Sequence, residues 1–141
     1  MKYLGIDFGT KRVGLAVSDD EGRIAFPKKV LLNNKNLLKE LLSFIKDENI
    51  QKIIVGDSKD LSGKENIISS LIEDFILQIK QNISLPVEKE KEFFSSYEAH
   101  GRMGKGSLVD RKQNFKKTED LDAKSAMIIL QRYLDRINNL K

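Results

Sequence analysis

The sequence contains no cysteine, only two prolines and a single histidine among its 141 residues. The lack of cysteine excludes disulfides, thiolate metal sites and cysteine nucleophiles, and it fits a reducing compartment such as the cytoplasm. No apolar run approaches the length that crosses a bilayer, and Asp7 interrupts the first apolar stretch too early for a secretory signal. We therefore expect a cytoplasmic protein with no membrane partner.

The chain also lacks a strong excess of charge of either sign. Lysine and arginine number 25 against 21 acidic residues, so the net charge is +4, which permits a nucleic-acid partner without establishing one. Hydrophobic residues make up 40 % and charged residues 33 %, as in ordinary globular proteins. Because the length is about that of one domain, we expect a single domain over residues 1–141.

The order of the predicted elements indicates the fold class. Strands are predicted over 2–8, 12–18, 23–32, 52–56 and 84–92, and helices over 34–49, 64–80, 95–103 and 121–138. The first three strands follow one another closely and predict an antiparallel meander. Later strands alternate with helices. The order βββαβαβα predicts an α/β fold with one mixed sheet and helices on both faces.

The first strand contains a carboxylate in an otherwise apolar run. Asp7 stands between Gly5 and Gly9, and glycines beside an acid let a ligand approach the backbone closely. The residue belongs either to a functional site or to an edge where it meets water, Lys11 or Arg12.

A second acid lies on the apolar stripe of the last predicted helix. Asp122 precedes Ala126, Ile129 and Tyr133 by four, seven and eleven residues, spacings that share one helical face. It is either an acid of the first helical turn, favoured by the helix dipole, or a residue that points into a site where the sheet ends.

A third acid, Glu92, ends the strand predicted over 84–92. Strand alternation places Glu88, Glu90 and Glu92 on one face, which by itself is typical of a solvated charged edge. If Glu92 converges with Asp7 and Asp122 at one edge of the sheet, the three carboxylates require a counter-charge. Divalent cations with oxygen ligands supply it, and two such ions activate water for attack on a phosphodiester.

Four segments together resemble the signature blocks of the YqgF-type family. They are GIDFGTKRVGLAVSD, VGDSKDLSGKEN, EFFSSYEA and DAKSAMIILQRYLD, in chain order. Members of this family are small RNase H-like proteins described as Holliday-junction resolvases and as nucleases of precursor 16S ribosomal RNA. The resemblance covers nearly the whole chain, and its first and last blocks are the most specific.

The resemblance implies that Asp7, Glu92 and Asp122 are catalytic and bind one or two Mg²⁺ or Mn²⁺ ions. Two blocks depart from the family pattern. The family reads Asp-Glu-Arg where this chain has Lys91-Glu92-Phe93, and it has an apolar residue and proline where Asp57-Ser58 stand. Asp57 is either an additional ligand or a turn residue, and we favour the turn.

Basic residues near these acids are candidates for phosphate contacts. Thr10, Lys11 and Arg12 follow Asp7 directly, and a glycine-flanked segment carries Arg102, Lys105, Arg111, Lys112, Lys116 and Lys117. The segment suits an arm that neutralises phosphates. For Thr10, Lys11 and Arg12, an interpretation as solvated turn residues is almost as well supported as phosphate contact. The single histidine, His100, is more consistent with a structural role than with proton transfer.

The sequence therefore predicts metal-dependent phosphodiester hydrolysis, with 5′-end processing of precursor 16S ribosomal RNA as the function that the resemblance favours. Its partners would be precursor rRNA and ribosomal particles. A resolvase of branched DNA is the first alternative, and a non-catalytic nucleic-acid-binding protein is the second. GIDFGT also suits an actin-like ATPase, but that architecture needs two such domains. Oligomeric state is not readable.

Overall fold

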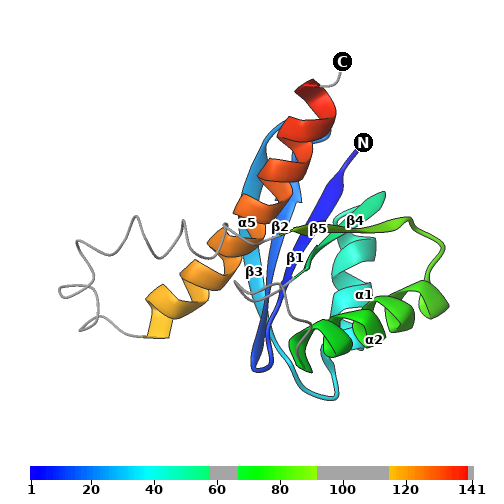
Figure 1. Ribbon diagram of the computed structural model, residues 1–141, viewed down its shortest axis with the longest axis vertical. Coiled ribbons are helices and arrows are strands. Elements are labelled where there is room, and N and C mark those ends of the chain that lie inside the picture. Colours follow the sequence, from blue (N-terminus) through cyan, green and yellow to red (C-terminus); the bar gives the residue numbers. More distant parts are fainter. Residues whose placement is uncertain (58–66, 92–114, 140–141) are drawn as a thin grey trace.

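The computed structural model describes residues 1–57, 67–91 and 115–139. The elements follow the predicted order (Figure 1): β1 (Tyr3–Phe8), β2 (Arg12–Ser18), β3 (Ala25–Leu32), α1 (Leu37–Asp47), β4 (Lys52–Asp57), α2 (Ile67–Asn82), β5 (Val87–Lys91) and α5 (Phe115–Asn139). The helix predicted over 95–103 lies outside the described residues. The last helix begins at Phe115, six residues before its predicted start.

The five strands form one mixed sheet, as the sequence predicts. Their order across the sheet is β3-β2-β1-β4-β5. β1 pairs antiparallel with β2, and β2 pairs antiparallel with β3. On its other side β1 pairs parallel with β4, and β4 pairs parallel with β5. The carboxyl ends of β1, β4 and β5 therefore lie at the same end of the sheet.

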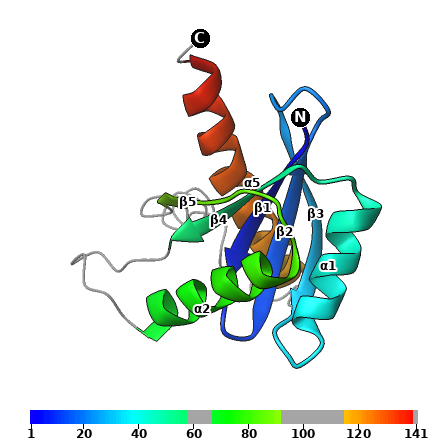
Figure 2. The same ribbon diagram turned by 90° about the vertical axis from the view of Figure 1, so that its right-hand side faces the viewer.

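Helices cover both faces of the sheet, which confirms the predicted layers. Figures 1 and 2 show α5 on one face and α1 with α2 on the other. Leu4, Ile6 and Phe8 of β1 belong to the core on the side of α1 and α2, so alternation turns Gly5 and Asp7 toward α5. In the described part of the chain, no helix has the length and apolar character needed to cross a membrane.

Two glycines let α5 lie directly on the sheet. A Cβ atom added to Gly5 would stand 2.6 Å from the Cβ of Leu130, and one added to Gly14 would stand 2.1 Å from the backbone oxygen of Asp122. Real Cβ atoms do not make such contacts, so side chains at these positions would displace the helix. Gly14 lies within β2, where an interior glycine is a sign of close backbone approach.

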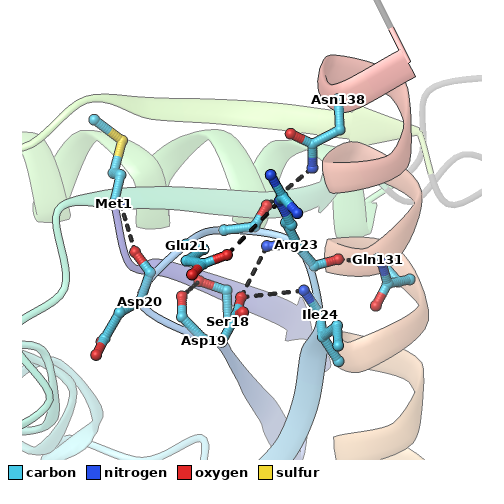
Figure 3. Close-up of polar contacts among 10 residues, drawn as sticks. Met1, Ser18, Asp19, Asp20, Glu21, Arg23, Ile24, Gln131 and Asn138 are labelled. Carbon is cyan, nitrogen blue, oxygen red and sulfur yellow. Dashed lines mark hydrogen bonds and ion pairs between the residues drawn. The ribbon is translucent and has the colours of Figure 1, made fainter. Parts of the chain in front are cut away.

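The turn between β2 and β3 closes the opposite end of the sheet with backbone hydrogen bonds (Figure 3). The carboxylate of Asp19 accepts from the backbone N–H groups of Arg23 and Ile24, at 2.8 and 3.1 Å. These bonds hold the pKa of the Asp19 carboxyl below its usual value. Gly22 has a positive φ of 69°, a conformation that glycine adopts without strain.

Side chains of α5 fasten the helix to this turn (Figure 3). Gln131 accepts a hydrogen bond from the backbone N–H of Ala25 at 2.8 Å. It donates one to the backbone oxygen of Arg23 at 2.9 Å, which Figure 3 shows. Asn138 donates to the backbone oxygen of Gly22 at 3.0 Å. The carboxyl-terminal half of α5 is therefore held by bonds to main-chain groups.

A charged cluster joins α5 to β4 and β5. Lys52 pairs with Glu88 at 3.0 Å, and Arg136 pairs with Glu90. The ring of Tyr133 has the Lys52 Nζ at 5.3 Å and the Arg136 Cζ at 5.2 Å from its centroid. Burial raises the pKa of Tyr133, and the hydrogen bond from Lys52 lowers the pKa of Glu88. Glu88 and Glu90 do share a face, as predicted, but they form ion pairs there.

Candidate metal and nucleic-acid site

Asp7 lies near the carboxyl end of the central strand, on the face that α5 covers. Its Cα is paired with that of Gly14 in the antiparallel register of β1 and β2. Directly opposed residues of antiparallel strands project from the same face, so Asp7 stands beside a position with no side chain. The Asp7 side chain is half-buried.

Asp122 reaches the same place from α5. The helix begins seven residues before it, at Phe115, so the interpretation of Asp122 as an acid of the first helical turn is wrong. The apolar stripe is confirmed, since Ala126 and Leu130 further along the helix are fully buried. The backbone of Asp122 packs against Gly14, the residue opposite Asp7. Gly14 therefore neighbours both residues, opposite Asp7 across the strand pair and directly beneath the backbone of Asp122.

Arg12 is the direct partner of Asp122. Its Nε donates a hydrogen bond to the Asp122 Oδ2 at 2.7 Å, and the side chains retain 32 % and 26 % of their exposure. Arg12 lies two residues before Gly14 on β2, so strand alternation places both beneath α5. The sequence suggested Arg12 as a phosphate contact, and it did not predict that the guanidinium would bind one of the candidate metal ligands.

The turn between β1 and β2 is held from outside by Asn33, a residue that the sequence analysis missed. The Asn33 side-chain amide donates to the backbone oxygen of Gly9 at 2.7 Å, and its backbone N–H donates to the oxygen of Lys11 at 2.9 Å. Thr10 and Lys11 are exposed on a turn that is thus fixed on both sides. An asparagine directly after a predicted strand was the available signal.

Asp57 does not join this site. It is the last residue of β4 and is paired in register with Lys91 of β5, so the favoured interpretation as a turn residue is wrong. Ile53 and Val55 belong to the core beneath α1 and α2. Alternation puts Asp57 on their face of the sheet, opposite to that of Asp7.

Most of the remaining candidates lie outside the described residues. Glu92 follows the last residue of β5 and is one of them, together with His100, Arg102, Lys105, Arg111 and Lys112. The backbone at Lys116 and Lys117 is in the first turn of α5, and their side chains are outside the described set. The predicted basic segment over 102–117 is therefore helical at its end, and its contact with phosphates stays a prediction.

The donor set at Gly14 fits a hard divalent cation. Asp7 and Asp122 supply carboxylate oxygens, the ligands that Mg²⁺ and Mn²⁺ prefer, and both lie at the carboxyl end of β1. Within residues 1–57, 67–91 and 115–139, no three acidic or histidine side chains converge at a metal site. A third protein ligand would come from elsewhere in the chain.

The family is established by sequence comparison. The model of the family described as "RuvX: Holliday junction resolvase" matches residues 1–136. A protein of Maridesulfovibrio salexigens named "Putative pre-16S rRNA nuclease" is 36 % identical over 96 % of this chain and 99 % of its own length. One of Lawsonia intracellularis with the same name is 38 % identical, with 96 % and 94 % covered. The chain belongs to the RuvX family.

Solved structures show the same fold at low sequence identity. The RuvC structure of Thermus thermophilus superimposes with a TM-score of 0.60 at 16 % identity and covers 98 % of this chain and 97 % of its own. T. thermophilus RuvC in complex with a Holliday junction substrate gives 0.59 at 14 %, with 95 % and 94 % covered. The fold is thus that of the RNase H-like resolvases, as the sequence predicts.

Proposed function

We propose that this member of the RuvX family is a cytoplasmic, metal-dependent nuclease that processes the 5′ end of precursor 16S ribosomal RNA. The observation that carries the proposal is that Gly14 lies opposite Asp7 in the strand pair and against the backbone of Asp122. The curated relatives named as pre-16S rRNA nucleases support the choice of RNA. In this proposal residues 1–141 act as one nuclease domain.

Asp7, Asp122 and Glu92 would hold one or two Mg²⁺ or Mn²⁺ ions. When bound, such ions activate water for attack on a phosphodiester and stabilise the leaving oxygen. The chain itself contributes two fixed carboxylates, one on a central strand and one on a helix seated on that strand's neighbour. Sites on such elements hold their geometry better than sites on loops.

Exposed polar and basic side chains near the site would bind the nucleic-acid backbone. Thr10 and Lys11 stand on the turn that Asn33 fixes, within four residues of Asp7. The basic residues of the later segment would extend the contact: Arg102, Lys105, Arg111, Lys112, Lys116 and Lys117. Phosphate contacts position a substrate without reading its sequence, so RNA shape, including that of a ribosomal particle, would determine specificity.

Resolution of branched DNA is the second candidate function. The description of the family model supports it, as does the structural similarity to a RuvC that was solved with a Holliday junction. A junction has two cleavage sites and favours a symmetric dimer, whereas trimming of one RNA end does not require one.

The test is a cleavage assay with the purified protein, Mn²⁺ or Mg²⁺, and two substrates. One substrate is RNA with a 5′ extension of the 16S precursor type, and the other is a four-way DNA junction. We expect metal-dependent cleavage of the RNA that is lost in the chelator and in Asp7→Asn. The matched control is Asp57→Asn, which removes an acid from the same end of the sheet but from the opposite face, and it should cleave normally.

The outcomes separate the candidate functions. Paired nicks in the junction, with the RNA intact, would replace RNA processing by resolution. Binding of either substrate without cleavage, with Mn²⁺ and with Mg²⁺, would contradict the proposed nuclease activity and favour a nucleic-acid-binding protein. Equal loss of cleavage in Asp7→Asn and Asp57→Asn would contradict the site itself.

A further inference from the structure

The ion pair between Arg12 and Asp122 places a fixed positive charge inside the candidate metal site. The two side chains come from positions 110 residues apart in the sequence, and the Arg12 Nε lies 2.7 Å from the Asp122 Oδ2. Each retains about a third of its exposure or less. The packing of α5 against Gly14 thus shields one side of the pair.

This contact has two consequences for the acid. A guanidinium hydrogen bond fixes the orientation of a carboxylate, because its N–H groups are planar and directional. It also offsets the negative charge of Asp122, whose backbone lies on Gly14 opposite Asp7, and like charges near one another repel. In the protein without metal, Arg12 therefore does part of what a cation would do.

We propose that Arg12 is a positioning residue that both orients Asp122 and competes with the metal for it. Binding of the ion has to share or replace the guanidinium, so Arg12 weakens metal binding while it keeps the metal-free site assembled. This inference rests on the proposed metal site and goes beyond it by assigning Arg12 a role toward the ion.

The neighbouring residue supplies a matched control. Lys11 has the same charge, directly precedes Arg12 in the chain and is exposed. In the described part of the chain its side chain makes no ion pair or hydrogen bond. Lys11→Gln and Arg12→Gln therefore change the net charge equally. A difference between them reports the direct contact with Asp122 and not the general electrostatic field.

The experiment measures binding of Ca²⁺ and Mn²⁺ alone by titration calorimetry, without nucleic acid, so that turnover plays no part. We expect Arg12→Gln to bind the ion about 2- to 5-fold more tightly than Lys11→Gln, the range of a partly exposed ion pair. Arg12→Lys, which keeps the charge but loses the planar donor, should lie between Arg12→Gln and the wild type.

Thermal unfolding of the same variants gives a second readout. Without metal, Arg12→Gln should melt at a lower temperature than Lys11→Gln, because Asp122 has lost its partner. Saturating metal should reduce that gap, since an ion that binds more tightly stabilises more. A merely structural ion pair would lower the melting temperature without changing the affinity for the ion.

Equal or weaker ion binding by Arg12→Gln than by Lys11→Gln would overturn the role of Arg12. If Arg12→Gln does not fold, a wild-type affinity in Arg12→Lys would have the same meaning. Failure of the underlying site is a different result. It would appear as no ion binding by the wild type, or as binding that Asp7→Asn leaves unchanged.

Discussion

The two halves of α5 are held to the sheet by different kinds of contact. In the carboxyl-terminal half, Arg136 forms an ion pair with Glu90 of β5, and Gln131 and Asn138 bind main-chain groups of the turn between β2 and β3. In the amino-terminal half, Asp122 lies against Gly14 and forms an ion pair with Arg12.

The two kinds of contact differ in whether one partner can be replaced by another. The main-chain groups at the turn have permanent partners, and a lost bond there leaves a buried donor unpaired. The carboxylates of Asp7 and Asp122 attract cations, so an arginine, a metal ion or both can neutralise them. One half of the helix therefore stabilises the fold, whereas the other carries Asp122, a ligand of the proposed metal site. Substitutions should separate the two.

The largest expected effect is on activity at the site. Asp122→Asn should lower cleavage by about 100-fold or more, because even residues that only support a metal ligand contribute about 10- to 100-fold. Its free energy of unfolding should change by no more than about 1 kcal/mol, the value of a partly exposed ion pair. Cleavage rates and urea unfolding measure the two. A loss of several kcal/mol in the free energy of unfolding would show that Asp122 stabilises the fold, as Gln131 and Asn138 do.

The next largest effect is expected on stability, where α5 packs against Gly14. In Gly14→Ala the new Cβ would meet a backbone oxygen at 2.1 Å, which can yield only if α5 moves. We expect a loss of about 3 kcal/mol, at or above the upper end for overpacked sites. Gly5→Ala is the comparison: its nearest neighbour is the Leu130 side chain at 2.6 Å, so its loss should be smaller. Urea unfolding of both variants measures the two losses of stability. A greater loss in Gly5→Ala than in Gly14→Ala would contradict the prediction.

A smaller effect is expected at the turn. Gln131→Ala would leave the backbone N–H of Ala25 without its partner, and Ala25 is only 5 % exposed. The expected loss is about 1–3 kcal/mol, the cost of an unpaired buried donor, with normal cleavage. Gln78→Ala on α2 is the control, since Gln78 is exposed and its side chain has no hydrogen bond within the described residues. Reduced cleavage at full stability in Gln131→Ala would break the separation of the two halves.

The smallest effect is a pH dependence at Asp19. Hydrogen bonds from the backbone of Arg23 and Ile24 lower its pKa in the folded state, below the value of about 3.9 in an unfolded chain. Its contribution to stability is therefore complete above about pH 4 and is lost as the pH falls through the folded-state pKa. The free energies of unfolding of the wild type and Asp19→Asn should converge in acid. A difference between the two free energies that stays constant as the pH falls would contradict this role of Asp19.

Local patterns in the sequence were enough for most of the fold. Alternation and apolar runs located all five strands, because a half-buried strand repeats every two residues. The start of α5 was missed for the complementary reason. Residues 115–120 read FKKTED and carry no apolar period, although lysine and glutamate form helices readily.

The candidate site was predictable in part. Asp7 and Asp122 were identified from an acid in an apolar strand and an acid on an apolar stripe, and the family resemblance linked them. The partner of Arg12 was not predictable, because residues 110 positions apart meet only when α5 has packed. The position of Asp57 on the other face was not predicted, because Asp57 was assigned to a turn and is the last residue of β4.

The sequence by itself determined which elements form, in which order, and which face of each is apolar, because those properties depend on neighbours a few residues away. The tertiary structure decided that Asp7 and Asp122 both neighbour Gly14 and that Asp122 pairs with Arg12. Strand register sets Asp7 opposite Gly14, and the missing side chain of that glycine lets Asp122 approach. Contacts of this kind arise from packing across the sheet, and no local pattern contains them.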